Sequence, residues 1–219
     1  MYETAKTLKL LKPQESEILS GHGIDIGCGP DPIAKNCVPF DVEQGDANHI
    51  LDYINEQFDY VWSSHCLEHM KNPEQCVKDW WSLVKPGGYM FLIVPDEDLY
   101  EQGVFPSRFN VDHKWTFTIS KQKSWSPVSI NVTDLVNSLS TVENYSIRLQ
   151  DLNYDRKLIH WGNSNRFLRI PWYLYLELKN RFNVELLFLE RFSSMFASVD
   201  QTMHSDRTAQ IFTVIKKKQ

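Results

Sequence analysis

A short apolar run that ends in two glycines, Gly23–Gly29, constrains the fold of this chain most strongly. Its first five residues predict a buried strand that passes into a tight turn, because glycine adopts backbone conformations that other residues avoid. Further strands are predicted at Val38–Val42, Asn48–Leu51, Phe58–Trp62 and Tyr89–Val94. Short strands joined by short connections and a helix are typical of a parallel α/β sheet.

The clearest helix is predicted between the last two of these strands. Asn72 can cap its first turn, and Pro73 suits the first helical position. The residues Cys76, Val77, Trp80, Trp81 and Val84 then share one face, until Lys85–Gly88 ends the helix. Two later strands are predicted at Val142–Asp151 and Ala209–Ile215, with a helix at Trp172–Arg181 between them.

Composition excludes several classes of protein. The 219 residues carry a net charge of −5, which argues against a general nucleic-acid binder. We expect no membrane insertion, since no stretch approaches about 18 apolar residues. The first residues contain no continuous apolar segment, so no secretory signal is expected. The four cysteines form no CxxC pair, which favours a reducing, cytoplasmic location.

The glycine turn also indicates the kind of ligand. Gly27 and Gly29 allow close approach of a ligand to the backbone, and Asp41 ends the second strand, where it can accept hydrogen bonds from a ribose. A dinucleotide fingerprint requires a third glycine where this chain has Pro32. We therefore expect an adenosyl ligand without phosphates rather than NAD.

Three segments resemble one known family. Gly23–Pro30, Phe58–His69 and Leu83–Gly88 occur in the order found in class I S-adenosylmethionine-dependent methyltransferases of the type-11 group. The resemblance covers residues 20–96. It implies a doubly wound α/β fold with a mainly parallel seven-stranded sheet, an insertion after strand 5, and S-adenosylmethionine as the cofactor.

The resemblance also implies a division of the chain and a set of cofactor-binding residues. A single domain over 1–219 would comprise a cofactor-binding half (1–96), an acceptor-binding insertion or lid (97–172) and a C-terminal helix and strand (173–219). The expected cofactor contacts are Asp25, Gly27, Cys28 and Gly29 for the methionine part, Asp41 for the ribose, Asp52 with Tyr53 for the adenine, and Ser64 with His65 near the sulfonium. Asp46–Ala47 is an alternative adenine contact. Only about nine residues separate Gly29 from the second strand, where most relatives have a full helix, so a shortened first helix is expected.

Methyl transfer to a hydroxyl calls for a general base, and histidine has a suitable pKa. Asp112–Phe117 follows the fifth strand and resembles the acceptor-side signature of the family. We rank His113 first, His65 second and Asp96 third as the catalytic base. A histidine that satisfies a buried loop is the alternative for His113.

Two other patterns suggest metal, and we expect none. His65, Glu68 and His69 match the zinc-protease pattern H-x-x-E-H, but Asn72–Pro73 opens a new helix directly afterwards, so the segment is too short. Asp96, Asp98 and Glu101 form an acidic cluster that we expect to be a solvated edge. The aromatic stretch Trp172–Phe192 is expected to be a core or subunit contact rather than a membrane surface.

The expected acceptor is a small molecule, most specifically a sugar hydroxyl in bacterial surface polysaccharide synthesis. Trp115, Trp125 and Trp161 offer flat apolar faces beside polar side chains, which suits a sugar ring. The basic residues Arg108, Lys121 and Lys123 would meet a phosphate, and Asp200–Thr202 resembles a feature of such enzymes. A different small-molecule acceptor, and a relative without turnover, are the alternatives. A homodimer is left open.

Overall fold

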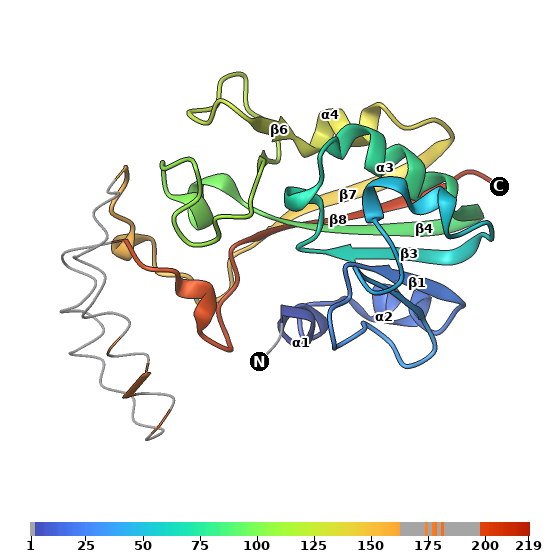
Figure 1. Cartoon of the computed structure of the whole chain (residues 1–219), viewed down its shortest axis with the longest axis horizontal. Coiled ribbons are helices and arrows are strands. Elements are labelled where there is room, and N and C mark those ends of the chain that lie inside the picture. The colour runs from blue at the N-terminus through green and yellow to red at the C-terminus, as the bar shows by residue number, and fades with distance from the viewer. Residues whose placement is uncertain (1–2, 163–173, 175–176, 179–180, 182–197) are drawn as a thin grey trace.

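A six-stranded sheet forms the centre of the molecule in the computed structural model, which describes residues 3–162, 174, 177, 178, 181 and 198–219 (Figure 1). The strand order is β2-β1-β3-β4-β8-β7. Their bounds are β1 Gly23–Ile26, β2 Val38–Phe40, β3 Phe58–Ser64, β4 Val84–Pro95, β7 Val142–Gln150 and β8 Gln210–Lys217. The first four strands are parallel, and β8 runs antiparallel to both β4 and β7.

Helices cover both faces of this sheet. α3 (Pro73–Ser82) and α4 (Val132–Asn137) lie on one face, and α1 (Glu3–Leu8) and α2 (Pro13–Ile18) lie on the other (Figure 1). Short helical turns connect the elements: η1 Ala47–Asp52, η2 Leu67–His69, η3 Glu97–Glu101, η4 Arg156–Leu158 and η6 Gln201–Met203. A second, two-stranded sheet pairs β5 (Thr116–Thr118) with β6 (Ser129–Asn131). The doubly wound α/β fold is thereby confirmed.

The two faces carry separate cores because side chains alternate along a strand. On β4, Met90 and Leu92 pack into the cluster beneath α3 and α4, while Phe91 and Ile93 pack into the cluster on the opposite face. On β3, Val61 and Trp62 divide in the same way. Burial on both faces explains why these strands are apolar throughout.

The expected helix after Asn72 is confirmed as α3. The Asn72 side chain accepts a hydrogen bond from the backbone N–H of Gln75 at 3.2 Å, which caps the helix. Trp80 and Trp81 are buried, and their indole N–H groups donate to the carbonyls of Ala47 and Ser140. Val84 begins β4 instead of ending the helix.

Two segments between β1 and β3 differ from the expected elements. Asn48–Leu51, predicted to be a strand, belongs to η1, so the main sheet has six strands in the described chain rather than seven. The Asp46 carboxylate accepts from the N–H of Asn48 at 2.9 Å and caps this turn, a local bond that competes with strand pairing. Residues 30–37 form no helix, although a shortened first helix was expected there; the backbone N–H of Ile33 bonds to the Asp25 side chain instead.

The segment after β4, which was expected to bind the acceptor, lies beyond the edge of the sheet. Residues 97–131 lie past the carboxyl ends of β3 and β4 (Figure 1). β7 and β8 confirm the two late strands, and β7 returns the chain to the main sheet inside the range expected for the insertion. The helix expected at Trp172–Arg181, and the aromatic stretch to Phe192, fall almost entirely outside the described residues. In the described part of the chain, no helix combines the length and apolarity needed to cross a bilayer.

Candidate functional site

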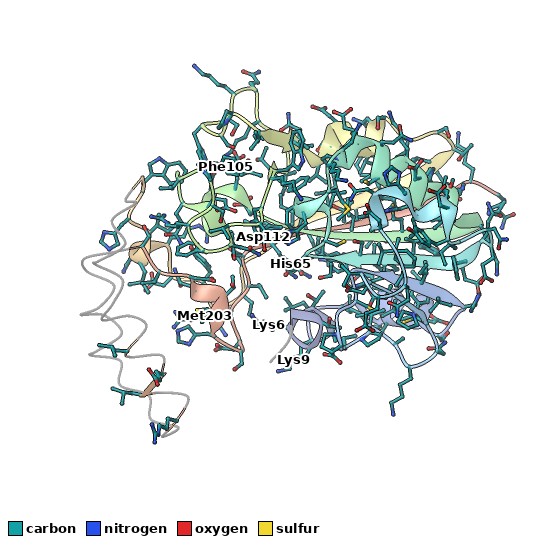
Figure 2. All side chains as sticks on the ribbon, viewed as in Figure 1. Lys6, Lys9, His65, Phe105, Asp112 and Met203 are labelled. Atoms are coloured by element: carbon teal, nitrogen blue, oxygen red, sulfur yellow. The ribbon has the colours of Figure 1, made fainter. Side chains whose placement is uncertain are left out.

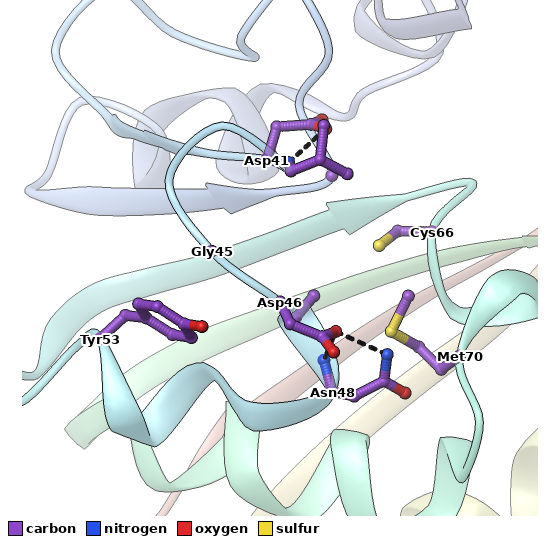
Figure 3. Close-up of a pocket in the computed structure, with 10 residues that line it drawn as sticks. Asp41, Gly45, Asp46, Asn48, Tyr53, Cys66 and Met70 are labelled. Carbon is purple, nitrogen blue, oxygen red and sulfur yellow. Dashed lines mark hydrogen bonds between the residues drawn. The ribbon is translucent and has the colours of Figure 1, made fainter.

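A pocket of about 410 Å³ opens where β1, β2 and β3 end (Figure 3). Open α/β sheets bind ligands at this edge, and the volume falls in the usual range for a small-molecule site. Its lining consists of Gly27, Asp41, Val42, Gly45, Asp46, Ala47, Asn48, Tyr53, Cys66 and Met70. The expected glycine turn and the aspartate after the second strand therefore lie in one cavity.

Gly27 is required where β1 turns into the pocket. Its φ of +77° lies in the left-handed region, and a Cβ added there would sit 2.5 Å from the Cβ of Cys66. Gly29, at φ +55°, is also left-handed. The turn therefore brings bare backbone to the pocket, as the sequence predicted.

Asp41 connects the end of β2 to this turn. One of its carboxylate oxygens accepts the N–H of Gly29 at 2.7 Å, and the other accepts the N–H of Val42 at 2.7 Å. A carboxylate has about four acceptor positions, so capacity remains for a ribose diol. The residue predicted to bind ribose thus lies in the pocket and is oriented by backbone bonds.

Tyr53 and the Asp46–Ala47 pair, which were both expected as adenine contacts, line the pocket together (Figure 3). Asp46 accepts hydrogen bonds from both the backbone N–H and the side-chain amide of Asn48, and these bonds lower its pKa. Asp52 is exposed and does not line the pocket. The geometry therefore favours the alternative pair Asp46–Ala47, together with Tyr53, over Asp52. In the sequence, the run Gly45–Ala47 was the feature that indicated this pair.

Asp25 does not line the pocket. The residue is 2% exposed, and its carboxylate accepts the N–H of Ile33 at 2.7 Å. Burial raises the pKa of Asp25 to about 7, although the bond from Ile33 opposes the shift. This contact fastens residues 30–37 in place of the missing helix.

The other residues expected near the methionine part and the sulfonium, Cys28, Ser64 and His65, do not line the pocket. Cys28 lies in a neighbouring depression with Gly29 and Asp41. The hydroxyl of Ser64 is buried without a hydrogen-bond partner among the described residues. His65 follows β3 at the carboxyl edge of the sheet (Figure 2). Its φ of +54° is unusual for histidine, and its Nε2 lies 3.0 Å from the side-chain oxygen of Gln210.

His113, the first-ranked base, is buried in a cluster of ionisable side chains beside η2. Its Nδ1 lies 2.8 Å from a carboxylate oxygen of Glu101, and its Nε2 lies 3.9 Å from one of Glu68. The rings of His69 and Tyr100 pack against it at 5.0 and 5.2 Å between centroids. His113 and Glu68 had both been singled out in the sequence. The spacing of His113 and Glu101 in the sequence did not indicate that they would pair.

Glu68 is completely buried within this cluster. Burial alone would raise its pKa, but neighbouring His65, His113 and His69 outweigh burial and lower it. The Nδ1 of His65 lies 3.4 Å from the same Glu68 oxygen that faces His113. The motif H-x-x-E-H is therefore a single short turn, as its position before Asn72–Pro73 predicted.

The acidic cluster after β4 does not converge on one point. Asp96 caps η3 by accepting the N–H groups of Asp98 and Leu99, and burial raises its pKa to about 6. Asp98 pairs with Lys121 and with the indole N–H of Trp125, and Glu101 pairs with His113. Each of these three carboxylates therefore bonds to different neighbours.

The tryptophans expected to form a sugar platform have different surroundings. Trp115 is partly buried and donates its indole N–H to the carbonyl of Met70 at 2.9 Å. Trp125 stacks edge-on against Trp161 with 5.7 Å between ring centroids, and Trp161 is 54% exposed. Lys121 is occupied by Glu97 and Asp98, each at 2.7 Å.

Comparison with known proteins finds matches to the first part of the chain. Residues 6–92 match a family model described as a methyltransferase domain. Over 75 residues the chain is 35% identical to a ubiquinone biosynthesis O-methyltransferase of Pseudomonas aeruginosa and 32% identical to that of Pseudomonas putida. In each case the match covers 32% of this chain and 32% of the relative. The chain thus spans about a third of the length of the curated relatives it matches.

The fold has matches among solved structures. A Thermotoga maritima structure described as an S-adenosylmethionine-dependent methyltransferase, possible histamine N-methyltransferase, superposes with a TM-score of 0.50 at 15% identity. The match covers 99% of this chain and 87% of that one. At this identity it supports the fold alone. Residues 6–92 therefore match a methyltransferase domain, as the sequence predicted, and the sheet agrees with the class I methyltransferase fold.

Proposed function

We propose that the whole chain transfers a methyl group from S-adenosylmethionine to a hydroxyl group of a small molecule. The observation that carries the proposal is the pocket in which Gly27, Asp41, Asp46 and Tyr53 meet at the carboxyl edge of the sheet. Gly27 presents backbone to the methionine part, Asp41 accepts from the ribose, and Asp46–Ala47 with Tyr53 flanks the adenine. The curated O-methyltransferases that match the same half of the chain support an oxygen acceptor.

Transfer from the positively charged sulfonium is a direct displacement at carbon. The protein aligns the acceptor oxygen with the methyl group and removes the acceptor's proton. The C–O bond forms as the C–S bond breaks, and the sulfur keeps the electron pair as neutral S-adenosylhomocysteine. The released proton passes to a base at the acceptor side.

We place His65 ahead of His113 as that base. The side chain of His65 is 22% exposed and adjoins Cys66, which lines the pocket, whereas the side chain of His113 is 4% exposed. The amide group of Gln210 donates to Thr7 and Gln150, so its oxygen faces His65 and fixes a proton on Nε2. Nδ1 is then the atom that gains the proton, with Glu68 beside it to stabilise the charged ring. Asp96 stays third because its carboxylate caps η3.

A sugar hydroxyl is the finer acceptor proposal, and it now rests on Trp161 and its partner Trp125. Trp161 is exposed and packs edge-on against the partly buried Trp125, so this pair offers an aromatic face to an acceptor. Trp115 and Lys121 are engaged within the protein and no longer support it. The acceptor panel should therefore contain sugar nucleotides and glycan fragments beside phenols.

The test is release of S-adenosylhomocysteine from the purified chain with S-adenosylmethionine and this panel. We expect release with at least one hydroxyl acceptor, and loss of turnover in His65→Gln while S-adenosylhomocysteine still raises the melting temperature. His49→Gln, another histidine of the same half, is the matched control and should keep wild-type turnover. If neither S-adenosylmethionine nor S-adenosylhomocysteine shifts the melting temperature, the chain does not bind the cofactor. If His65→Gln keeps wild-type turnover, His65 is not the base.

A further inference from the structure

We propose that Glu68, His69 and His113 bind a divalent transition-metal ion beside the cofactor pocket. Each residue offers one ligand atom, and these atoms all lie within 4.8 Å of one another. Glu68 and His69 lie on η2, between the pocket-lining residues Cys66 and Met70, and His113 comes from the segment beyond β4. The fold therefore brings the three ligands together from two distant parts of the chain.

Glu68 supplies an independent reason for a ligand here. Its side chain is completely buried, yet neither carboxylate oxygen accepts a hydrogen bond from the described residues. The closest nitrogens are those of His65 at 3.4 Å and His113 at 3.9 Å, which are longer than charge-assisted hydrogen bonds. A buried carboxylate normally has hydrogen-bond partners or coordinates a metal.

The two histidines are oriented as metal ligands usually are. The Nδ1 of His69 lies 3.2 Å from the carbonyl oxygen of Asp112, which can only accept, so Nδ1 carries the proton and Nε2 carries the free lone pair. The Nδ1 of His113 is likewise held by Glu101 at 2.8 Å, and its Nε2 faces Glu68. A carbonyl or carboxylate on the second ring nitrogen fixes the tautomer of a metal-binding histidine.

The donor set indicates the class of metal. Two imidazoles and one carboxylate form the protein ligands of many catalytic zinc sites and of non-haem iron sites, whereas Mg²⁺ and Ca²⁺ prefer oxygen. Glu68 and Glu101 are both buried, so a doubly charged ion would balance their charge. Three protein ligands leave a coordination position for water or an acceptor oxygen. The H-x-x-E-H pattern did not predict this site, because it contains only Glu68 and His69. The third ligand, His113, lies 44 residues after His69.

Cobalt substitution tests the site directly. Chelator-treated protein is titrated with Co²⁺, followed by visible absorption, and with Zn²⁺, followed by calorimetry. We expect one ion per chain, a Co²⁺ band typical of nitrogen and oxygen ligands, and no sulfur-to-cobalt charge-transfer band from the buried cysteines. His69→Gln and His113→Gln should lose the band, and Glu101→Gln should weaken binding about 10- to 100-fold through the His113 orientation. Mg²⁺ should give no heat.

His22→Gln is the matched control, since His22 is exposed and pairs with Glu56 away from the cluster. It should bind Co²⁺ like the wild type. Absence of the band in wild-type protein, or an unchanged band in both His69→Gln and His113→Gln, overturns the site. Glu68→Gln should also lose the band; if it does not fold, the two histidine variants decide. Metal binding is measured without turnover, so its failure leaves the proposed methyl transfer intact, and a shift in melting temperature with S-adenosylhomocysteine tests that separately.

Discussion

The carboxylate of Asp41 accepts the backbone N–H of Gly29 across 2.7 Å, joining the end of β2 to the turn after β1. Both residues line the depression beside the main pocket. Residues 30–37 form no helix, so this bond holds the turn in place of one. One residue therefore both shapes the pocket and offers acceptor capacity to its ligand.

Replacing Asp41 by Asn should weaken S-adenosylhomocysteine binding about 10- to 100-fold. The amide oxygen can still accept from Gly29, but the variant loses the charged acceptor for the ribose, a loss worth about 1.5–3 kcal/mol. Isothermal calorimetry measures the change. Glu43→Gln, an exposed neighbour, should bind like the wild type. Equal affinity for Asp41→Asn and Glu43→Gln would remove Asp41 from the ligand contacts.

Asp46→Ala and Asp52→Ala should separate the two adenine assignments. Asp46 lines the pocket and caps η1, so its loss should weaken ligand binding and lower the free energy of unfolding by about 1 kcal/mol. Asp52 is exposed outside the pocket, and its variant should change neither quantity. Calorimetry and urea denaturation give the two numbers. Weaker ligand binding in Asp52→Ala alone would restore the first assignment.

Gly27→Ala should destabilise the fold by at least about 2 kcal/mol, since it combines a left-handed backbone with a clash against Cys66. Gly162→Ala isolates the backbone effect, because Gly162 has a φ of +73° but no atom within 4 Å of an added Cβ. Its cost should be about 1 kcal/mol. Urea denaturation compares the two. Equal costs would mean that Cys66 moves aside freely.

Asp25 should make the fold less stable as the pH rises. Its pKa is about 7 in the folded chain against an ordinary value near 3.8, so the folded state holds a proton that the unfolded state releases. This stabilisation is fully present below the unfolded pKa and is lost as the pH rises through about 7. Between about pH 5 and about pH 7.5 the loss is on the order of 3 kcal/mol.

Asp25→Asn keeps an acceptor for Ile33 and removes this titration, so its unfolding free energy should change less over the same interval. Asp52→Asn, an exposed aspartate, should follow the wild-type curve. Denaturation curves at both pH values provide the comparison. Parallel curves for Asp25→Asn and the wild type would show that Asp25 ionises normally in the folded chain. Asp96, with a pKa raised to about 6, contributes in the same direction in all three proteins.

Local sequence patterns were enough to predict the α/β class, the glycine turn at Gly27, the position of Asp41 and the capped helix α3. Each depends on residues close together in the chain: a strand that passes into glycine, an aspartate after the next strand, and an asparagine before proline. These local patterns fix backbone conformation with little help from distant residues. Local pattern alone gave a wrong prediction at Asn48–Leu51, where the Asp46 carboxylate accepts a hydrogen bond from the Asn48 N–H and a helical turn forms instead of a strand.

Which polar groups face one another depends on long-range packing. Glu68 and His113 lie 45 residues apart, yet the carboxyl edge of the sheet brings His113 Nε2 to 3.9 Å from the Glu68 carboxylate. The choice of Asp46 over Asp52 likewise depends on the direction in which η1 turns its side chains. Spacing along the chain carries no information on such encounters, because packing of the whole sheet and the segment beyond it sets those distances.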